Sequence, residues 1–217
     1  MHSRGFTLVE MLVVMAISAI LIAAAVPSFQ SLIASTRASS ASGTLISSME
    51  YARSEAIRRN QNVTVCRTDN ANAPENVLAC NDAAAGNFDG NDWGSGWIVF
   101  AKAGTGANFS AFEWDADPAL SDFLLMRQPA ANAGATRAAV WSTLAGAQRV
   151  AYRGDGMPAG VVATRFFVDY GPVPTPAVAA RNPIPLTLTT AGRCLAVAGG
   201  TGRVRAYRPT LNTCPTL

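Results

Sequence analysis

Apolar residues follow two different patterns along the chain. Residues 11–26 are apolar except for Ser18, and this apolar run extends back to Phe6 with one carboxylate, Glu10, inside it. A run of about 21 residues forms roughly 30 Å of helix, which matches the hydrocarbon core of a bilayer. The chain is therefore expected to begin with a membrane-spanning helix.

Beyond Pro27 the apolar residues recur every three or four positions, a spacing typical of an amphipathic helix. These apolar positions are Phe29, Leu32, Ile33, Leu45, Met49, Ala52 and Ala56. The pattern predicts a helical continuation over residues 29–60 whose apolar face packs on a globular domain. The solvated side of that helix is expected to carry Arg53, Glu55, Arg58 and Arg59. Pro27 has no amide hydrogen, so it is expected to kink or locally melt the helix.

After Asn60-Gln61-Asn62 the helical spacing stops, and short β-branched and aromatic runs alternate with Gly, Pro, Asn and Asp. Runs of this kind are typical of β-strands. They lie at 63–66, 96–101, 123–127, 150–153, 161–168, 186–190, 194–198 and 203–207. Gly154-Asp155-Gly156 predicts a hairpin turn between two strands. The chain is thus predicted to be an α+β protein, with a long N-terminal helix packed on a mainly antiparallel β-sheet domain.

The composition excludes most catalytic and metal-binding machinery. The 217 residues contain one histidine, His2, so the rest of the chain cannot supply an imidazole base, a His-containing triad or a His metal cluster. The sequence also offers no nucleophile paired with a base and no convincing pair of carboxylates for acid–base catalysis. We therefore expect a protein that is not an enzyme and that uses no cofactor and no metal.

All four cysteines follow the membrane segment. An even number of cysteines in an exported domain indicates disulfide bonds, and the sequence alone allows three ways of pairing them. Pairing between neighbours along the chain would join Cys66 to Cys80 and Cys194 to Cys214. A zinc site is disfavoured because the cysteines have no C-x-x-C spacing and no histidine to accompany them.

Charge is unevenly distributed, although the net charge is only +3. Residues 69–122 carry nine acids and a single base, Lys102, whereas no acid follows Asp169. The C-terminal part carries Arg181, Arg193, Arg203, Arg205 and Arg208. Because a guanidinium binds phosphate or carboxylate in a planar, bidentate geometry, this part of the chain is a candidate anion-binding surface.

The segment Arg4-Gly5-Phe6-Thr7-Leu8-Val9-Glu10 places a carboxylate in the first turns of the apolar run. A carboxylate in that position costs free energy and indicates a function with a cationic partner. No cationic side chain lies nearby, and the natural partner is an α-amine formed by cutting the chain before Phe6. The segment resembles the type III signal of type IV pilins and type II secretion pseudopilins.

This resemblance implies three properties of the N-terminus. A prepilin peptidase is expected to cut after Gly5, the new N-terminal residue Phe6 is expected to be methylated, and Glu10 is expected to neutralise the amine of an adjacent subunit during assembly. The alternative is an ordinary signal peptide cut after Ala23-Ala24-Ala25. The apolar run begins only five residues into the chain and contains Glu10, and both features favour the prepilin signal.

Further segments resemble the GspH/FimT family of minor pilins and pseudopilins. They are YARSEAIRRN at 51–60, VTVC at 63–66, WGSGWIVF at 93–100 and GRVR at 202–205. The stretches 101–147 and 172–185 resemble no segment of this family that we can name. The resemblance nevertheless covers most of the chain.

The family resemblance implies a type IV pilin-like fold in four parts. These are a prepilin leader at 1–5, a transmembrane and filament-core helix at 6–28, an amphipathic continuation at 29–60 and a periplasmic β-rich domain at 61–217. The implied location is the bacterial inner membrane, crossed once, followed by a pilus or pseudopilus filament. The implied partners are the prepilin peptidase, other major and minor pilins or pseudopilins, and the inner membrane.

The C-terminal GRVR segment has two interpretations. If 194–198 and 203–207 form a hairpin, alternation places Arg203, Arg205 and Tyr207 on one face about 6.6 Å apart. Such a strip suits successive phosphates, and it resembles the tail implicated in binding double-stranded DNA for natural transformation by FimT-type minor pilins. Arg208 and Arg193 are added to this candidate DNA-binding set because of their charge and proximity.

In the second interpretation these arginines guard an exposed sheet edge or bind acidic faces of neighbouring subunits. The protein would then be a GspH-like minor pseudopilin of the type II secretion system with a purely structural role. The charge of the tail favours the first interpretation, a FimT-like type IV pilus component that binds extracellular DNA for uptake.

Overall fold

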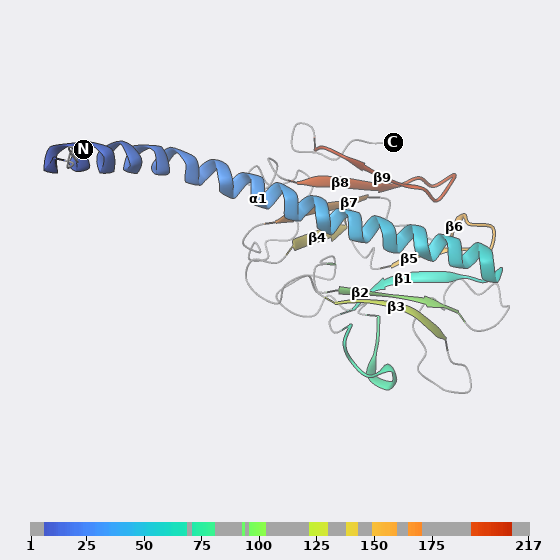
Figure 1. The fold of residues 1–217 in the computed structure, drawn as a ribbon. Helices are drawn as coiled ribbons and strands as arrows, with labels where there is room; N and C mark the ends of the chain where they lie inside the picture. The colour runs from blue at the N-terminus through green and yellow to red at the C-terminus, as the bar shows by residue number, and fades with distance from the viewer. Residues whose placement is uncertain are drawn as a thin grey trace, which may run out of the picture.

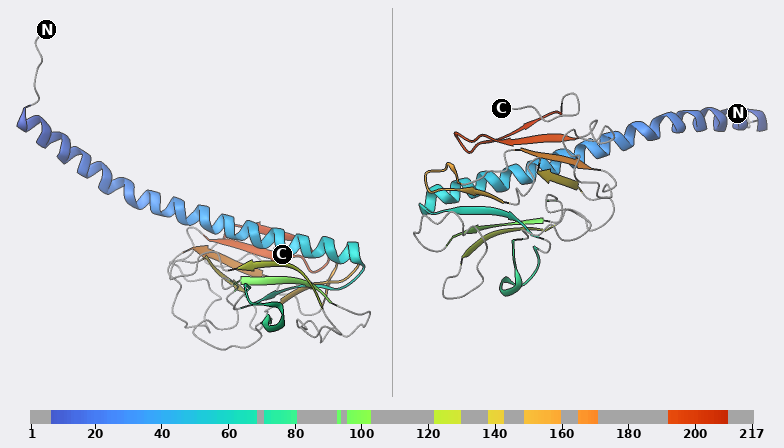
Figure 2. Two further views of the ribbon diagram at one scale, coloured as in Figure 1. Left: turned by 60° about the horizontal axis from the view of Figure 1, so that its bottom comes forward. Right: turned by 180° about the vertical axis from the view of Figure 1, so that it is seen from behind.

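The computed structural model describes residues 7–68, 71–80, 93, 96–102, 122–129, 138–142, 149–159, 165–170 and 192–209. A long helix, α1, lies across a domain built from two antiparallel sheets (Figure 1). The C-terminal half of α1 follows the sheets, whereas its N-terminal half extends away from them (Figure 2). The α+β fold predicted from the sequence is confirmed.

The helix α1 (Leu8–Arg59) is continuous and has a defined residue at each end. At its start, the Thr7 hydroxyl accepts a hydrogen bond from the Glu10 amide at 3.3 Å, which satisfies one of the unpaired donors of the first turn. At its end, Asn60 adopts a left-handed conformation (φ 52°, ψ 40°), a common way to terminate a helix. The helix therefore ends where the sequence predicted.

The backbone remains helical through Pro27, where a kink or local melting was predicted. Figure 2 shows a gradual curve along the N-terminal half of α1 rather than a break at one point. A proline removes a single amide donor and crowds the preceding turn, and a helix of 52 residues can distribute that distortion over several turns. The prediction of a melted segment was wrong.

The helix packs on the domain only along its C-terminal half. The fully buried apolar residues of α1 are Ala38, Leu45, Met49, Ala52 and Ala56, and four of these were predicted. Every side chain described between Thr7 and Ile33 is exposed, including Phe29 at 63% and Leu32 at 61%. The prediction that Phe29, Leu32 and Ile33 pack on the domain was therefore wrong, because the sheets do not reach that far along the helix.

The exposed half of α1 contains one segment, Leu8–Ala25, that is long and apolar enough to cross a membrane. None of this segment is buried against the domain. Because no buried side chain is described before residue 38, removing the first 29 residues takes away no described core contact.

The domain contains two antiparallel sheets. The first has the strand order β3-β2-β1-β5-β6 and the second has the order β4-β7-β8-β9. The strands of the first sheet are β1 (Val63–Arg67), β2 (Gly96–Ala101), β3 (Phe123–Pro129), β5 (Arg149–Tyr152) and β6 (Pro158–Ala159). Those of the second sheet are β4 (Ala138–Ser142), β7 (Arg165–Tyr170), β8 (Arg193–Val197) and β9 (Val204–Tyr207). A short 3-10 helix, η1 (Glu75–Val77), lies between β1 and β2.

Where the predicted strands fall on described residues, they agree with the structure to within one or two residues. The predicted strand 161–168 is described only from Arg165 onward, as β7. The strand β4 was not predicted, because its sequence AAVWS has no clear alternation of apolar and polar residues and it depends on pairing with β7. The predicted strand 186–190 lies outside the described residues.

One core joins α1 to both sheets. Val65 and Val99 of the first sheet and Phe166 and Leu195 of the second are fully buried in the same cluster as the helix residues. Trp93 is also fully buried and contacts the edge of the Phe166 ring, with the ring centroids 5.1 Å apart. Burial of an apolar side chain contributes about 1.5–3 kcal/mol, so this shared core accounts for the close association of the two sheets.

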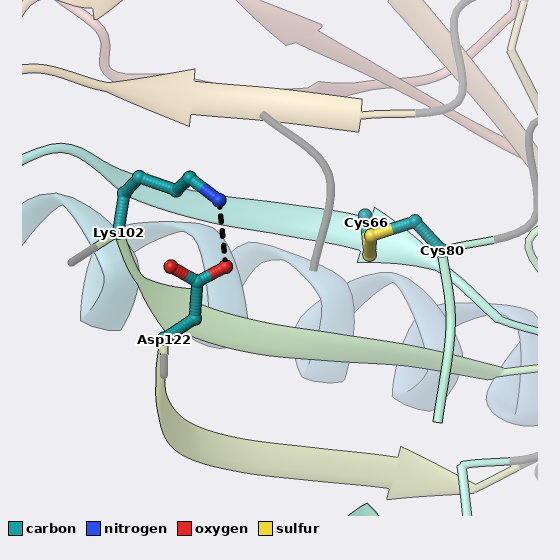
Figure 3. Close-up of a disulfide and its surroundings, with 4 residues drawn as sticks. All are labelled: Cys66, Cys80, Lys102 and Asp122. Atoms are coloured by element: carbon teal, nitrogen blue, oxygen red, sulfur yellow. Dashed lines mark hydrogen bonds and ion pairs between the residues drawn. A yellow bond between two sulfur atoms is a disulfide. The ribbon is translucent and has the colours of Figure 1, made fainter. Parts of the chain in front are cut away.

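One disulfide bond and one ion pair link parts of the chain beside the first sheet (Figure 3). A disulfide bond joins Cys66 of β1 to Cys80. The ammonium of Lys102, just after β2, lies 3.0 Å from the carboxylate of Asp122, just before β3, and the Asp122 side chain is fully buried. The ion pair therefore joins the two ends of the 103–121 segment.

Candidate functional site

The first turn of α1 contains the described part of the N-terminal motif. The Glu10 side chain is exposed there, and the backbone N–H of Glu10 donates a hydrogen bond to the Thr7 hydroxyl. A carboxylate in a first turn also interacts favourably with the helix dipole. Gly5 and Phe6, the predicted cleavage and methylation positions, lie outside the described residues.

The C-terminal arginines lie on the hairpin formed by β8 and β9. The strands pair antiparallel from Cys194 opposite Tyr207 to Val197 opposite Val204. The turn between them is closed by a hydrogen bond from the Ala198 amide to the Arg203 carbonyl at 2.9 Å. The predicted hairpin is present, and β9 forms an edge of the second sheet.

Arg203 and Arg205 share the face of the hairpin that points away from the core. Val204 packs against the core cluster, so its neighbours in the chain point the other way. Both arginines are exposed, and neither forms an ion pair with any carboxylate in the described part of the chain. The two guanidinium groups are thus available for an anionic partner.

The other predicted members of this surface differ from Arg203 and Arg205 in position or exposure. Arg193 is on the same face of β8 as the core residue Leu195, and its guanidinium donates to the Ser35 hydroxyl of α1 at 3.4 Å. The sheet separates it from the Arg203–Arg205 face, because alternate residues of a strand point to opposite sides. Tyr207 is half-buried with a buried hydroxyl, so it is not an open stacking platform. Arg208 is exposed just after β9.

Gly202 is required by packing at the hairpin turn. It has a φ of +68°, and a Cβ at this position would lie 2.7 Å from the Gly156 carbonyl oxygen. Gly156, in the predicted turn between β5 and β6, has a φ of +77°, and a Cβ at this position would lie 2.7 Å from the Ile57 side chain of α1. The glycine of the GRVR segment therefore lets two turns and the helix meet, a role that the motif itself does not reveal.

A carboxylate from α1 lies beside the arginine-bearing strand. Glu50 accepts a hydrogen bond from the Val204 amide at 3.1 Å, and Arg53 donates to the Gly156 carbonyl at 3.0 Å. The sequence places no acid near the C-terminal arginines, so Glu50 was missed. No local pattern connects residues 154 positions apart, and only the packing of β9 on α1 brings them together.

Tyr152 lies in the core close to Glu50, Arg53 and Gly202. Its side chain is fully buried, and a Cβ on Gly202 would lie 3.1 Å from its ring. Burial raises the pKa of the Tyr152 hydroxyl, and the nearby Glu50 charge raises it further. The tyrosine is therefore neutral at physiological pH and acts as a packing surface for the hairpin turn.

The charged residues near the end of α1 are less exposed than the sequence predicted. Glu55 is buried and accepts hydrogen bonds from Arg58 at 2.7 Å and 2.9 Å and from Arg59 at 2.8 Å. The hydrogen bonds from Arg58, then those from Arg59, lower the pKa of Glu55 to about 2. Arg59 also lies over the ring of Phe123 at 5.7 Å. Of the four residues predicted to be solvated, Arg58 is mainly exposed and Glu55 is buried, whereas Arg53 and Arg59 contact Gly156 and Phe123 of the domain.

The cysteines that the structure describes are disulfide-bonded. Cys66 and Cys80 form a disulfide bond as expected, and Cys194 is disulfide-bonded as well. Cys214 lies outside the described residues, so its pairing with Cys194 stays a prediction. Within the described ranges, no group of three or more His, Cys, Asp or Glu side chains is placed to hold a metal ion.

Comparison with known proteins identifies the family to which the chain is similar. Residues 41–200 match the family described as Type II transport protein GspH, and residues 1–26 match the prokaryotic N-terminal methylation motif. No curated protein sequence matches the chain. Two crystal structures of the type IV minor pilin FimU of Pseudomonas aeruginosa are similar to it. The first structure is 17% identical to this chain, with a TM-score of 0.41, and the match covers 78% of this chain and 87% of FimU. The second is 16% identical, with a TM-score of 0.40, and the match covers 78% of this chain and 91% of FimU.

The two sequence matches together cover the apolar half of the N-terminal helix and most of the β-rich domain. The methylation motif includes the apolar half of α1, and the GspH match extends from the packed half of α1 into the turn of the β8–β9 hairpin. Both agree with a prepilin-type N-terminus joined to a β-rich domain. The chain therefore belongs to the GspH family of minor pilins and pseudopilins.

Proposed function

We propose that the protein is a minor pilin of a type IV pilus and that its β8–β9 hairpin binds extracellular double-stranded DNA for uptake. The observation that supports DNA binding is the pair of exposed arginines, Arg203 and Arg205, on one face of an edge strand. Neither is neutralised by a carboxylate within the described residues.

The spacing of the two arginines suits a phosphate backbone. Alternate residues of a strand lie about 6.6 Å apart, and each guanidinium can bind a phosphate with two hydrogen bonds. Contacts of this kind hold DNA without reading its sequence. Each neutralised phosphate contributes about 0.9 to the slope of log affinity against log salt, so we expect weak, salt-sensitive and sequence-independent binding by a single subunit.

The N-terminal part of the proposal concerns processing and assembly. The prepilin peptidase cuts after Gly5, Phe6 is methylated, and Glu10 pairs with the amine of an adjacent subunit. The exposed apolar half of α1 holds the chain in the inner membrane with the β-domain in the periplasm, until the protein enters the filament with other pilins. Mass spectrometry of the protein purified from membranes tests this part, because a Gly5→Val variant should keep residues 1–5.

A purely structural role in a type II secretion pseudopilus is the second candidate. It is favoured by the description of the matching family, Type II transport protein GspH. In this role the arginines of β9 prevent pairing of an exposed sheet edge or contact acidic subunits.

DNA binding separates the two candidates. The full chain, in a non-ionic detergent, is titrated into a fluorescein-labelled DNA duplex at several salt concentrations, and fluorescence anisotropy is measured. The double variant Arg203→Ala, Arg205→Ala should bind much more weakly, and the salt slope of its residual binding should be lower by about 1.8 because two phosphate contacts are removed. The matched control, Arg37→Ala with Arg153→Ala, removes two other exposed or half-exposed arginines and should bind like the unaltered chain. Negligible binding by all three proteins would support the pseudopilin role.

A further inference from the structure

A backbone amide of β9, the strand that carries Arg205, donates a hydrogen bond to a side chain of α1. The carbonyl of Arg203 accepts from the Ala198 amide, so the backbone groups of Arg203 point toward β8. Backbone groups alternate along an edge strand, so those of the next residue, Val204, point outward. The outward amide of Val204 is the one that donates to the Glu50 carboxylate at 3.1 Å.

The same helical turn also holds the neighbouring hairpin. The Arg53 guanidinium lies 3.9 Å from the Glu50 carboxylate and donates to the Gly156 carbonyl at 3.0 Å. Gly156 in turn lies against Gly202, which directly precedes Arg203. Two adjacent contacts on α1 therefore fix both ends of the short segment from Gly202 to Val204.

We propose that Glu50 is a positioning residue for the DNA-binding arginines. It fixes the backbone between Arg203 and Arg205 to the rigid helix, so that both guanidinium groups are presented together to the phosphates. A mobile hairpin would lose conformational entropy on binding DNA, whereas a hairpin already held by α1 does not. This inference rests on the proposed DNA-binding function of the same hairpin.

Electrostatics alone predicts the opposite effect for this residue. A carboxylate beside the arginines repels a polyanion, so removing its charge should strengthen DNA binding if Glu50 acted only through charge. A positioning role predicts that removing the hydrogen-bond acceptor weakens DNA binding despite the more positive surface. The two roles therefore differ in the sign of one measurable change.

The test compares three variants of the full chain in the anisotropy assay. Glu50→Ala removes both charge and acceptor and should weaken DNA binding about threefold to tenfold. Glu50→Gln removes the charge but keeps an acceptor oxygen, and should bind at least as tightly as the unaltered chain. Glu75→Ala is the matched control, because it removes a carboxylate that is 65% exposed and belongs to η1, between two strands of the sheet that does not contain β9. Glu50→Ala binding as tightly as Glu75→Ala would overturn the positioning role.

Hydrogen exchange provides a second measurement that does not depend on DNA. Mass spectrometry of peptides covering residues 203–207 should show faster exchange in Glu50→Ala than in the unaltered chain, and near-normal exchange in Glu50→Gln. If the unaltered chain binds no DNA, the proposed function fails, and the exchange result alone then decides whether Glu50 holds the strand. Unchanged exchange in Glu50→Ala would overturn the inference even if the chain binds DNA.

Discussion

The ion pairs of Glu55 lead to a quantitative prediction about stability and pH. Glu55 is a buried residue of the last turns of α1, and its carboxylate accepts hydrogen bonds from Arg58 and Arg59, which lower its pKa from 4.5 to about 2. Each pKa unit corresponds to about 1.4 kcal/mol, so the shift sets an upper limit of about 3 kcal/mol on the stabilisation. The Arg58 side chain is 62% exposed and its contribution is screened by solvent, so we expect about 1–2 kcal/mol.

The sign of the pH dependence follows from the direction of the shift. The pKa is lower in the folded state, so the interaction stabilises the fold only while Glu55 is ionised. The stabilisation is complete above a pH of about 4.5 and is lost as the pH falls from there toward about 2. Glu55→Gln should therefore be less stable than the unaltered protein at neutral pH and equally stable near pH 2.

Urea unfolding of residues 30–217 measures this difference, with the fluorescence of the buried Trp93 and Trp97 as the signal. The quantity to plot is the unfolding free energy of the unaltered protein minus that of Glu55→Gln, at each pH. Glu75→Gln is the matched control, because its carboxylate is 65% exposed and its ion pair with Arg127, at 3.4 Å, lies at the surface, so it should change the unfolding free energy by less than about 1 kcal/mol. A Glu55→Gln difference that is absent at neutral pH, or that persists unchanged at pH 2, would refute the reasoning.

Three further predictions concern packing and cross-links. Gly202→Ala must adopt a positive φ and approach the Gly156 carbonyl, so it should destabilise the protein by more than about 1–2 kcal/mol in thermal unfolding; an unchanged melting temperature would contradict this. Asp122→Ala leaves the Lys102 ammonium without its buried carboxylate and should cost about 3–5 kcal/mol in urea unfolding, whereas a loss below 1 kcal/mol would show that the pair is unimportant. Replacing Cys66 and Cys80 by alanine opens a loop with a sequence separation of 14 and should cost about 3 kcal/mol, and equal stability would refute the predicted contribution of this disulfide.

Local sequence information was sufficient for the elements whose pattern depends on near neighbours. The end of α1 at Asn60 and the extent of β2 follow from spacing and from turn-forming residues, and both agree with the structure. The hairpin that carries Arg203 and Arg205 was predictable for the same reason, because strand alternation and a glycine-rich turn act over a few residues. The strand β4 was not predictable, because its pairing with β7 supplies what its own alanine-rich sequence lacks.

The sequence by itself therefore determined the apolar segment that is long enough to span a membrane, the long helix, most strands and the two exposed arginines. Only the tertiary structure decided which side chains share a surface. It separated Arg193 from Arg205 by the thickness of a sheet, brought Glu50 to the Val204 amide, and left Phe29 beyond the reach of the domain. The physical reason is that periodicity assigns a residue to one face of its own element, whereas the partner of that face depends on how distant segments pack.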